Sequence, residues 1–106
     1  LLYMEECKMI MVFAEGKVPG NQREAYLKAV AESGAVLTVR QEKGCLRYDV
    51  SASASDSDTV YITESWENFN AVREHMTGDG MAALNDINAK FFVAYAASLY
   101  QASPLG

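Results

Sequence analysis

The sequence is poor in the residues that build metal and redox centres. Its 106 residues include two cysteines, Cys7 and Cys45, and a single histidine, His75. Two cysteines are too few for a disulfide framework or a zinc site, and neither has a second ligand near it in the sequence. Cys45 begins an apolar alternating segment and is best explained as a small buried hydrophobic residue. The sequence therefore predicts no metal site and gives no sign of a bound cofactor.

Long apolar runs and clusters of positive charge are also missing. No stretch approaches the roughly 20 apolar residues that cross a bilayer. The first ten residues lack the basic start and the small-residue cleavage site of a secretory signal. The nine basic residues are scattered and the formal net charge is -5, which argues against tracking a phosphate backbone. These absences predict a cytoplasmic protein that binds neither nucleic acid nor membranes.

The composition is that of an ordinary globular protein. Half of the residues are hydrophobic and 22% are charged, as in soluble domains with one core. We expect residues 8–106 to form a single domain. Residues 1–7 are expected to be a disordered N-terminal segment, or residues from outside the natural domain.

Four segments have the apolar patterns of strands. They are Lys8–Glu15, Cys45–Ser51, Thr59–Trp66 and Phe91–Tyr100. The second segment alternates, which predicts Leu46, Tyr48 and Val50 on one face. The small polar residues at 51–58 indicate a hairpin tip between the second and third strands.

Two helical regions alternate with these strands. The first spans residues 22–43, and Asn21 is its expected N-cap. Gly34 should bend this helix, because glycine costs about 1 kcal/mol relative to alanine inside a helix. Gly44 is the expected stop.

The second helical region is broken in two. Its first piece has Phe69, Val72 and Met76 at core spacing. The two pieces span residues 68–76 and 81–89, on either side of an interruption at 78–80.

This order of elements, βαββαβ, predicts an α+β fold of the ferredoxin-like type. Such a fold has an antiparallel four-stranded sheet with its helices on one face. The first and last strands are apolar on both faces, so the face without helices would expose a large apolar surface. Face-to-face packing of two sheets would cover it, and we therefore expect a homodimer.

Glu64, Trp66 and His75 are the candidate catalytic residues. Side chains two apart on a strand point the same way, so Glu64 and Trp66 share a face, and His75 follows on the next helix. A carboxylate, an indole and an imidazole could line one cavity between sheet and helices. Histidine is the natural general base, because imidazole ordinarily titrates near pH 6.5.

Structural roles are the alternative for each of these residues. His75 could be a partly exposed helix residue, and Trp66 the large core residue under the helices. Glu64 could form a salt bridge with Arg47 or Arg73.

Four further residues are candidate substrate contacts. They are Phe13, Tyr48, Met76 and Met81. Aromatic rings and flexible thioethers suit an apolar ligand, and we expect Phe13 and Tyr48 to line the same cavity. The alternative is that these residues belong to the plain hydrophobic core.

Several pieces of sequence, taken in order, resemble one family. The pieces are Phe13–Glu15 before Pro19–Gly20, the run Glu42–Tyr48, the pair Glu64 and Trp66, and Val72–His75. Together they resemble the antibiotic biosynthesis monooxygenases, which are dimeric α+β barrel proteins. That family includes cofactor-independent quinol and anthrone oxygenases, haem-degrading enzymes, an isomerase of a signalling molecule and many uncharacterised members.

The resemblance implies a cofactor-independent monooxygenase that oxidises a small quinol- or anthrone-like aromatic with O₂. One departure is that many relatives carry a second histidine where Gly80 and Met81 align here. Haem-degrading relatives have an axial histidine near the position of Leu84, and His75 comes too early to replace it. Two alternatives stay open: a non-catalytic dimeric module for ligand binding or stress response, and an isomerase or degradation enzyme for a small carbonyl metabolite.

Overall fold

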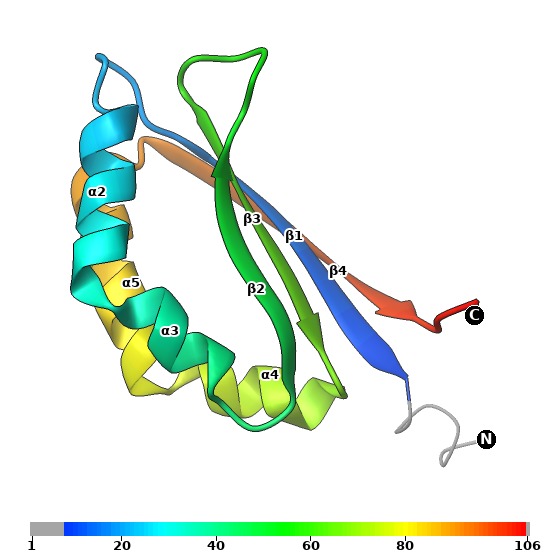
Figure 1. Ribbon diagram of the computed structural model, residues 1–106. Helices are drawn as coiled ribbons and strands as arrows, with labels where there is room; N and C mark the ends of the chain where they lie inside the picture. The colour runs from blue at the N-terminus through cyan, green and yellow to red at the C-terminus, as the bar shows by residue number, and fades with distance from the viewer. Residues whose placement is uncertain (1–7, 106) are drawn as a thin grey trace.

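Four strands form one antiparallel sheet in the computed structural model, which describes residues 8–105 (Figure 1). The strands are β1 (Met9–Lys17), β2 (Cys45–Ala52), β3 (Thr59–Trp66) and β4 (Ala94–Ala102). They lie in the order β2-β3-β1-β4, and each neighbouring pair is antiparallel. The predicted ferredoxin-like α+β fold is therefore confirmed. The segment expected at residues 1–7 lies outside the described residues.

Within residues 8–105, four helices cover one face of the sheet and leave the other face free of helices (Figure 1). They are α2 (Arg23–Ser33), α3 (Ala35–Arg40), α4 (Phe69–Met76) and α5 (Asp79–Phe91). None of these helices is long and apolar enough to cross a bilayer. The space between helices and sheet holds the hydrophobic core.

The first helical region consists of two helices rather than one bent helix. Gly34 has φ 70°, a left-handed conformation that glycine adopts at little steric cost, and it separates α2 from α3. The expected N-cap at Asn21 is wrong. Asn21 itself has φ 61°, and Gln22 occupies the N-cap position without a side-chain hydrogen bond.

The buried stripe of α4 differs from the predicted one. α4 buries Ala71, Val72 and His75, whereas Phe69 is 52% exposed and Met76 is 63% exposed. The expected core roles of Phe69 and Met76 are therefore wrong. Residues 71, 72 and 75 share one side of the helix, and the period of about 3.6 residues per turn directs Phe69 and Met76 away from that side.

The end of α5 and the start of β4 also lie later than predicted. α5 begins inside the expected interruption and runs to Phe91, so β4 begins at Ala94. Phe92, between them, packs with its ring centroid 5.0 Å from that of Tyr26. Its ring also occupies the space beside Gly16, where a Cβ would lie 2.5 Å from it. This long-range packing sets the boundary, and the local apolar pattern does not reveal it.

A bulge at the start of β2 changes which of its side chains face the helices. Cys45 pairs with Trp66 and Arg47 pairs with the neighbouring Ser65, so Leu46 is an extra residue in β2. Leu46 is 52% exposed. The prediction that strict alternation puts Leu46 on the face of Tyr48 is therefore wrong.

Cross-strand pairing defines one row of side chains that matters for the site. Val12 pairs with Glu64 on one side and with Leu99 on the other, and Tyr48 pairs with Glu64. Paired residues point to the same face, so these four form one row on the face that carries the helices. At the end of this row, on the edge strand β4, Leu99 is 50% exposed. Phe13, one position along, points to the opposite face.

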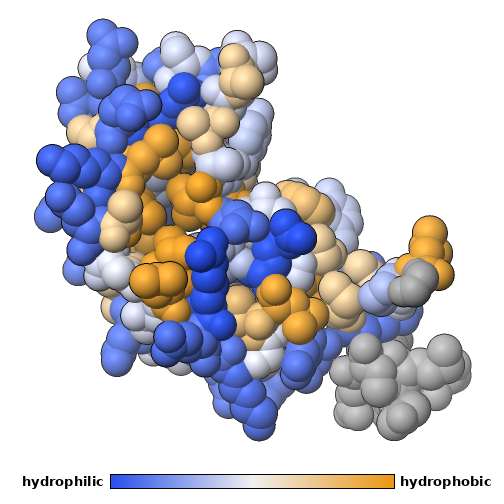
Figure 2. Space-filling view, viewed as in Figure 1, coloured by the Kyte–Doolittle hydropathy of each residue, from blue (hydrophilic) through white to orange (hydrophobic). Residues whose placement is uncertain are grey.

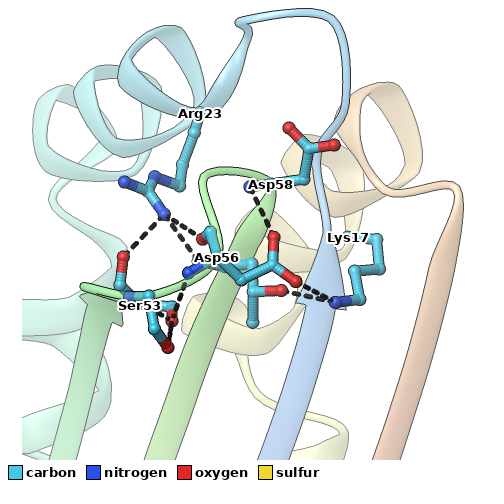
Figure 3. A network of polar contacts seen from close by, with 7 residues as sticks. Lys17, Arg23, Ser53, Asp56 and Asp58 are labelled. Atoms are coloured by element: carbon cyan, nitrogen blue, oxygen red, sulfur yellow. Dashed lines mark hydrogen bonds and ion pairs between the residues drawn. The ribbon is translucent and has the colours of Figure 1, made fainter.

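The hairpin tip between β2 and β3 is held by a polar network (Figure 3). The Arg23 guanidinium donates to the backbone oxygens of Ser53 at 2.9 Å and Asp56 at 2.7 Å. Lys17 lies 2.9 Å from the Asp56 carboxylate. Hydrogen bonds from the Asp58 backbone N–H and from Lys17 lower the pKa of Asp56 to about 2. The tip is thereby joined to both α2 and β1.

Candidate active site

Glu64 and Trp66 lie side by side at the end of β3, as the strand period predicts. Trp66 is fully buried, and its indole Nε1–H donates to Glu64 Oε1 at 3.0 Å. Glu64 is buried as well. Burial raises the pKa of Glu64, while the Trp66 hydrogen bond and the charge of His75 oppose the rise. Glu64 is thus a carboxyl group that holds its proton more strongly than an exposed one.

His75 lies against Trp66 from the side of α4. The two ring centroids are 4.6 Å apart with an interplanar angle of 31°, and His75 is only 4% exposed. Its Nε2 is 3.8 Å from Glu64 Oε1, too far for a hydrogen bond but near enough for charges to interact. The alternative of a partly exposed histidine is wrong, and the three predicted catalytic side chains lie together.

Glu42 completes this group, although nothing in the sequence alone marked it as a candidate catalytic residue. It lies in the turn after α3, and its Oε1 is 2.7 Å from His75 Nδ1. The short contact fits an Nδ1–H that donates to the carboxylate, which leaves the Nε2 lone pair directed towards Glu64. The only signal in the sequence was its place in the run Glu42–Tyr48. We call Glu42, Glu64, Trp66 and His75 the His75 cluster.

Tyr48 packs on the same imidazole from β2. Its ring centroid is 5.7 Å from that of His75, and it is buried. Burial, and next the charge of Glu64, raise the pKa of Tyr48. Tyr48 is therefore a neutral aromatic wall of the His75 cluster.

An outer cavity of about 320 Å³ adjoins the cluster between α3 and α4. Its lining includes Glu42 and His75 themselves, together with the carboxylates of Glu74 and Asp79. Glu42 is 20% exposed through its side chain, against 3% for His75. The Glu42 carboxylate is thus the point at which the buried cluster meets solvent.

A second cavity of about 340 Å³ lies between α5 and the start of β4. It is lined by Met81, Asn85, Asn88, Ala89, Phe92 and Tyr95, and its volume lies in the range of small-ligand pockets. The Tyr26 hydroxyl donates to Asn88 Oδ1 at 2.8 Å. Burial and the charge of Glu64 raise the pKa of Tyr95. We call this the α5–β4 cavity.

Two of the predicted substrate contacts lie elsewhere. Phe13 is on the face without helices, where its ring centroid lies 6.0 Å from that of Tyr100. The expectation that Phe13 and Tyr48 line one cavity is therefore wrong, because neighbouring strand residues point to opposite faces. Met76 points into solvent from the end of α4. Met81, by contrast, lines the α5–β4 cavity.

The chain is similar to known proteins in sequence and in fold. The sequence model of the antibiotic biosynthesis monooxygenases matches residues 9–86. Among solved structures, a candidate antibiotic biosynthesis monooxygenase from Nitrosomonas europaea has a TM-score of 0.80 at 18% identity, with 89% of each chain covered. Another from Caulobacter crescentus has a TM-score of 0.80 at 20% identity, with 96% of each chain covered.

A third similar structure is a Bacteroides thetaiotaomicron protein of unknown function, described as a possible oxidoreductase. Its TM-score is 0.79 at 22% identity, over 90% of this chain and 98% of that one. At these identities the structural likeness shows the fold alone. No curated protein sequence matches the chain.

Proposed function

The chain belongs to the antibiotic biosynthesis monooxygenase family, and we propose that it is a cofactor-independent monooxygenase for a small quinol- or anthrone-like aromatic. The observation that carries this proposal is the buried His75 cluster, in which His75 Nδ1 is held by Glu42 at 2.7 Å and Nε2 faces Glu64. A base held in this way can remove a proton from a bound phenol away from bulk water.

The proton leaves the substrate towards Glu64 and His75. The raised pKa of Glu64 makes its carboxylate a stronger base than an exposed glutamate. Trp66 donates to one oxygen of that carboxylate. Once Glu64 has taken the proton, its carboxyl group can donate a hydrogen bond to His75 Nε2 if the two approach by roughly less than 1 Å. Glu42 stabilises the imidazolium that results and connects it to the outer cavity, where the proton reaches solvent.

The oxidation itself uses O₂ as the second substrate. The deprotonated aromatic passes one electron to O₂, and the two radicals combine as a peroxide on the ring carbon. That peroxide takes up a proton and then loses water, which leaves a carbonyl. For an anthrone-like CH₂ group, one oxygen atom of O₂ enters the product and the other leaves as water. O₂ is the oxidant, and the CH₂ carbon is oxidised to the carbonyl.

The aromatic ring is placed in the α5–β4 cavity in this proposal. Met81, Phe92 and Tyr95 supply apolar and aromatic contacts, and the side-chain amides of Asn85 and Asn88 supply polar ones. The polar groups can hold the oxygens of a quinol while the ring rests on apolar atoms. A small flat aromatic fits this mixture better than an extended polar metabolite does.

A homodimer is the second part of the proposal. The face without helices carries Phe13, Tyr61 and Tyr100, which are 48%, 38% and 55% exposed. Large aromatic residues gathered on one sheet face are usually covered by a partner. Two such faces packed together would cover both sets through a twofold contact.

Oxygen uptake with menadiol and with anthrone tests the enzymatic part. We expect turnover by the wild type and a loss of about 10²- to 10⁴-fold in kcat in His75→Ala. Asn70→Ala is the matched control, because Asn70 is an exposed residue of the same helix. Unchanged oxygen uptake in His75→Ala would contradict the proposed base. Product formed without O₂ would indicate an isomerase, and binding without any product would indicate a ligand-binding module.

A further inference from the structure

An apolar cavity lies apart from the His75 cluster, between α2, α3 and the edge strand β2. Its volume is about 440 Å³, and its lining includes Leu27, Val30, Val36, Leu37 and Val50. Figure 2 shows hydrophobic side chains gathered around a hollow over these elements, with hydrophilic ones beside it. We call it the α2–α3 cavity, and it has the volume of a small-molecule pocket.

The backbone explains why this cavity is open. The chain turns at Gly34, which has φ 70° and separates the axes of α2 and α3. β2 is the edge strand of the sheet, so Val50 has no neighbouring strand beyond it. The apolar side chains at this corner are thus only partly covered, and Leu37 is 63% exposed.

Positive charge lies at one end of the α2–α3 cavity. Arg40 lines it and also lines an adjoining cavity of about 370 Å³ together with Arg47 and Asp49. The Asp49 carboxylate is shared, since it lies 2.9 Å from Arg40 Nη2 and 3.4 Å from Arg47 Nη1. Two guanidinium groups therefore face one carboxylate, in a protein whose net charge is -5. This end can accept a second anion.

We propose that the α2–α3 cavity binds an amphiphilic carboxylate, a small molecule with a hydrocarbon body and one carboxylate head. The body lies among Leu27, Val36 and Val50, and the head pairs with Arg40 at the end of this cavity and with Arg47 in the adjoining one. Arg40 is held in place for this role, because its Nε also donates to the backbone oxygen of Tyr48 at 2.9 Å. The hollow shape and the charge at one end favour such a molecule over a flat protein partner.

Titration calorimetry with decanoate, below its micelle-forming concentration, tests this proposal. We expect one decanoate per chain, with decyltrimethylammonium of the same chain length binding at least about tenfold more weakly, since a cation cannot form charge-assisted hydrogen bonds with guanidinium groups. Added salt should weaken the binding of decanoate. Backbone amide signals of residues 27–40 and 46–50 should shift on titration.

Two variants test the contacts of the carboxylate head and of the hydrocarbon body separately. Arg47→Ala should weaken decanoate binding about tenfold, and Leu37→Gln should weaken decanoate and the cationic homologue alike. Both residues are exposed, Arg47 at 60% through its side chain and Leu37 at 63%, so the fold should persist, which circular dichroism checks. Lys28→Ala, on the exposed side of α2, is the control.

Three outcomes would overturn the proposal. One is equal affinity for the anionic and cationic chains, and another is binding that neither Arg47→Ala nor Leu37→Gln weakens. The third is a change in oligomeric state in Leu37→Gln, since that result would make this corner a contact between two copies of the chain.

Discussion

Glu42 Oε1 lies 2.7 Å from His75 Nδ1, although the two residues are 33 positions apart in the sequence. The contact joins the turn after α3 to the last turn of α4. It fixes the orientation of the imidazole, so that Nε2 is directed at Glu64. Glu42 is therefore a positioning residue, and its removal should affect His75 before it affects anything else.

The first prediction concerns Glu42→Ala. Without the carboxylate, the Nδ1–H loses its acceptor and the imidazole is free to change tautomer. We expect kcat for menadiol or anthrone oxidation to fall by about 10²-fold or more, with KM little changed, because the ring-binding residues are untouched. The ¹⁵N shifts of the His75 ring should show a loss of the single Nδ1–H tautomer.

Glu42→Gln is the informative companion to this variant. Its amide oxygen can still accept the Nδ1–H, but it carries no charge. It should keep the tautomer and recover only part of the activity. If the ring tautomer of His75 is the same in the wild type and in Glu42→Ala, Glu42 does not position the imidazole.

The second prediction concerns the pH dependence of stability through Glu64. Burial raises the pKa of Glu64 above its ordinary value of 4.5. At pH values between 4.5 and the folded-state pKa, Glu64 therefore holds a proton in the folded state that it releases in the unfolded state. Stability should therefore fall as the pH rises from about 4.5 through the folded-state pKa. Below that window the contribution of Glu64 is constant.

Glu64→Gln tests this pH dependence directly. Glutamine can still accept the Trp66 indole N–H but does not titrate. Urea unfolding at several pH values should show that the variant gains stability relative to the wild type as the pH rises through the window. A difference that stays constant with pH would show that Glu64 does not titrate with a raised pKa.

The third prediction concerns Gly16, which lies under the ring of Phe92. A Cβ on residue 16 would lie 2.5 Å from Phe92 Cζ, and that ring is confined on its other side by Tyr26 at 5.0 Å between centroids. Gly16→Ala should therefore destabilise the fold by about 1–3 kcal/mol, despite the entropy that alanine removes from the unfolded chain. Chemical denaturation measures this cost.

A double-mutant cycle with Phe92→Leu is the control for Gly16. The smaller side chain leaves room for the added methyl group, so Gly16→Ala should cost less in that background. Equal costs in both backgrounds would show that Phe92 is not the obstacle.

The sequence predicts what depends on neighbouring residues. β3 was expected at Thr59–Trp66 and is found there, because its alternation and its flanking turn are both local. Glu64 and Trp66 share one face of β3 because side chains on a strand alternate with the same period of two. The order of strands and helices is likewise sufficient for the ferredoxin-like fold.

Features that depend on packing between distant segments were not predicted. The contact of Glu42 with His75 needs the turn after α3 to lie against α4, and no local pattern marks it. The bulge at Leu46 reverses the direction of side chains at the start of β2 without a glycine to reveal it. The aromatic character of Phe13 suggests a place in the cavity, but its neighbour Val12 is the residue that pairs with Glu64 and shares its face.

The last prediction concerns Phe13 as a contact between the sheet faces of two chains. It lies on the face without helices beside Tyr100, and it is 48% exposed in the single chain. If two such faces pack together, a charge at this position would be buried against its twofold equivalent. Phe13→Glu should therefore be a monomer at micromolar concentration by light scattering, whereas we expect the wild type to be a dimer.

Phe69→Glu is the matched control, because Phe69 is 52% exposed but belongs to α4. Replacing it removes the same aromatic area from the helical side and adds the same charge, so a dimer that uses the bare sheet face should persist. A wild-type monomer would contradict the proposed dimer, and dissociation by Phe69→Glu instead of Phe13→Glu would place the contact on the helices. Because Phe13 is on the far side of the sheet from His75, a monomeric Phe13→Glu that still oxidises the substrate would show that each chain carries a complete site.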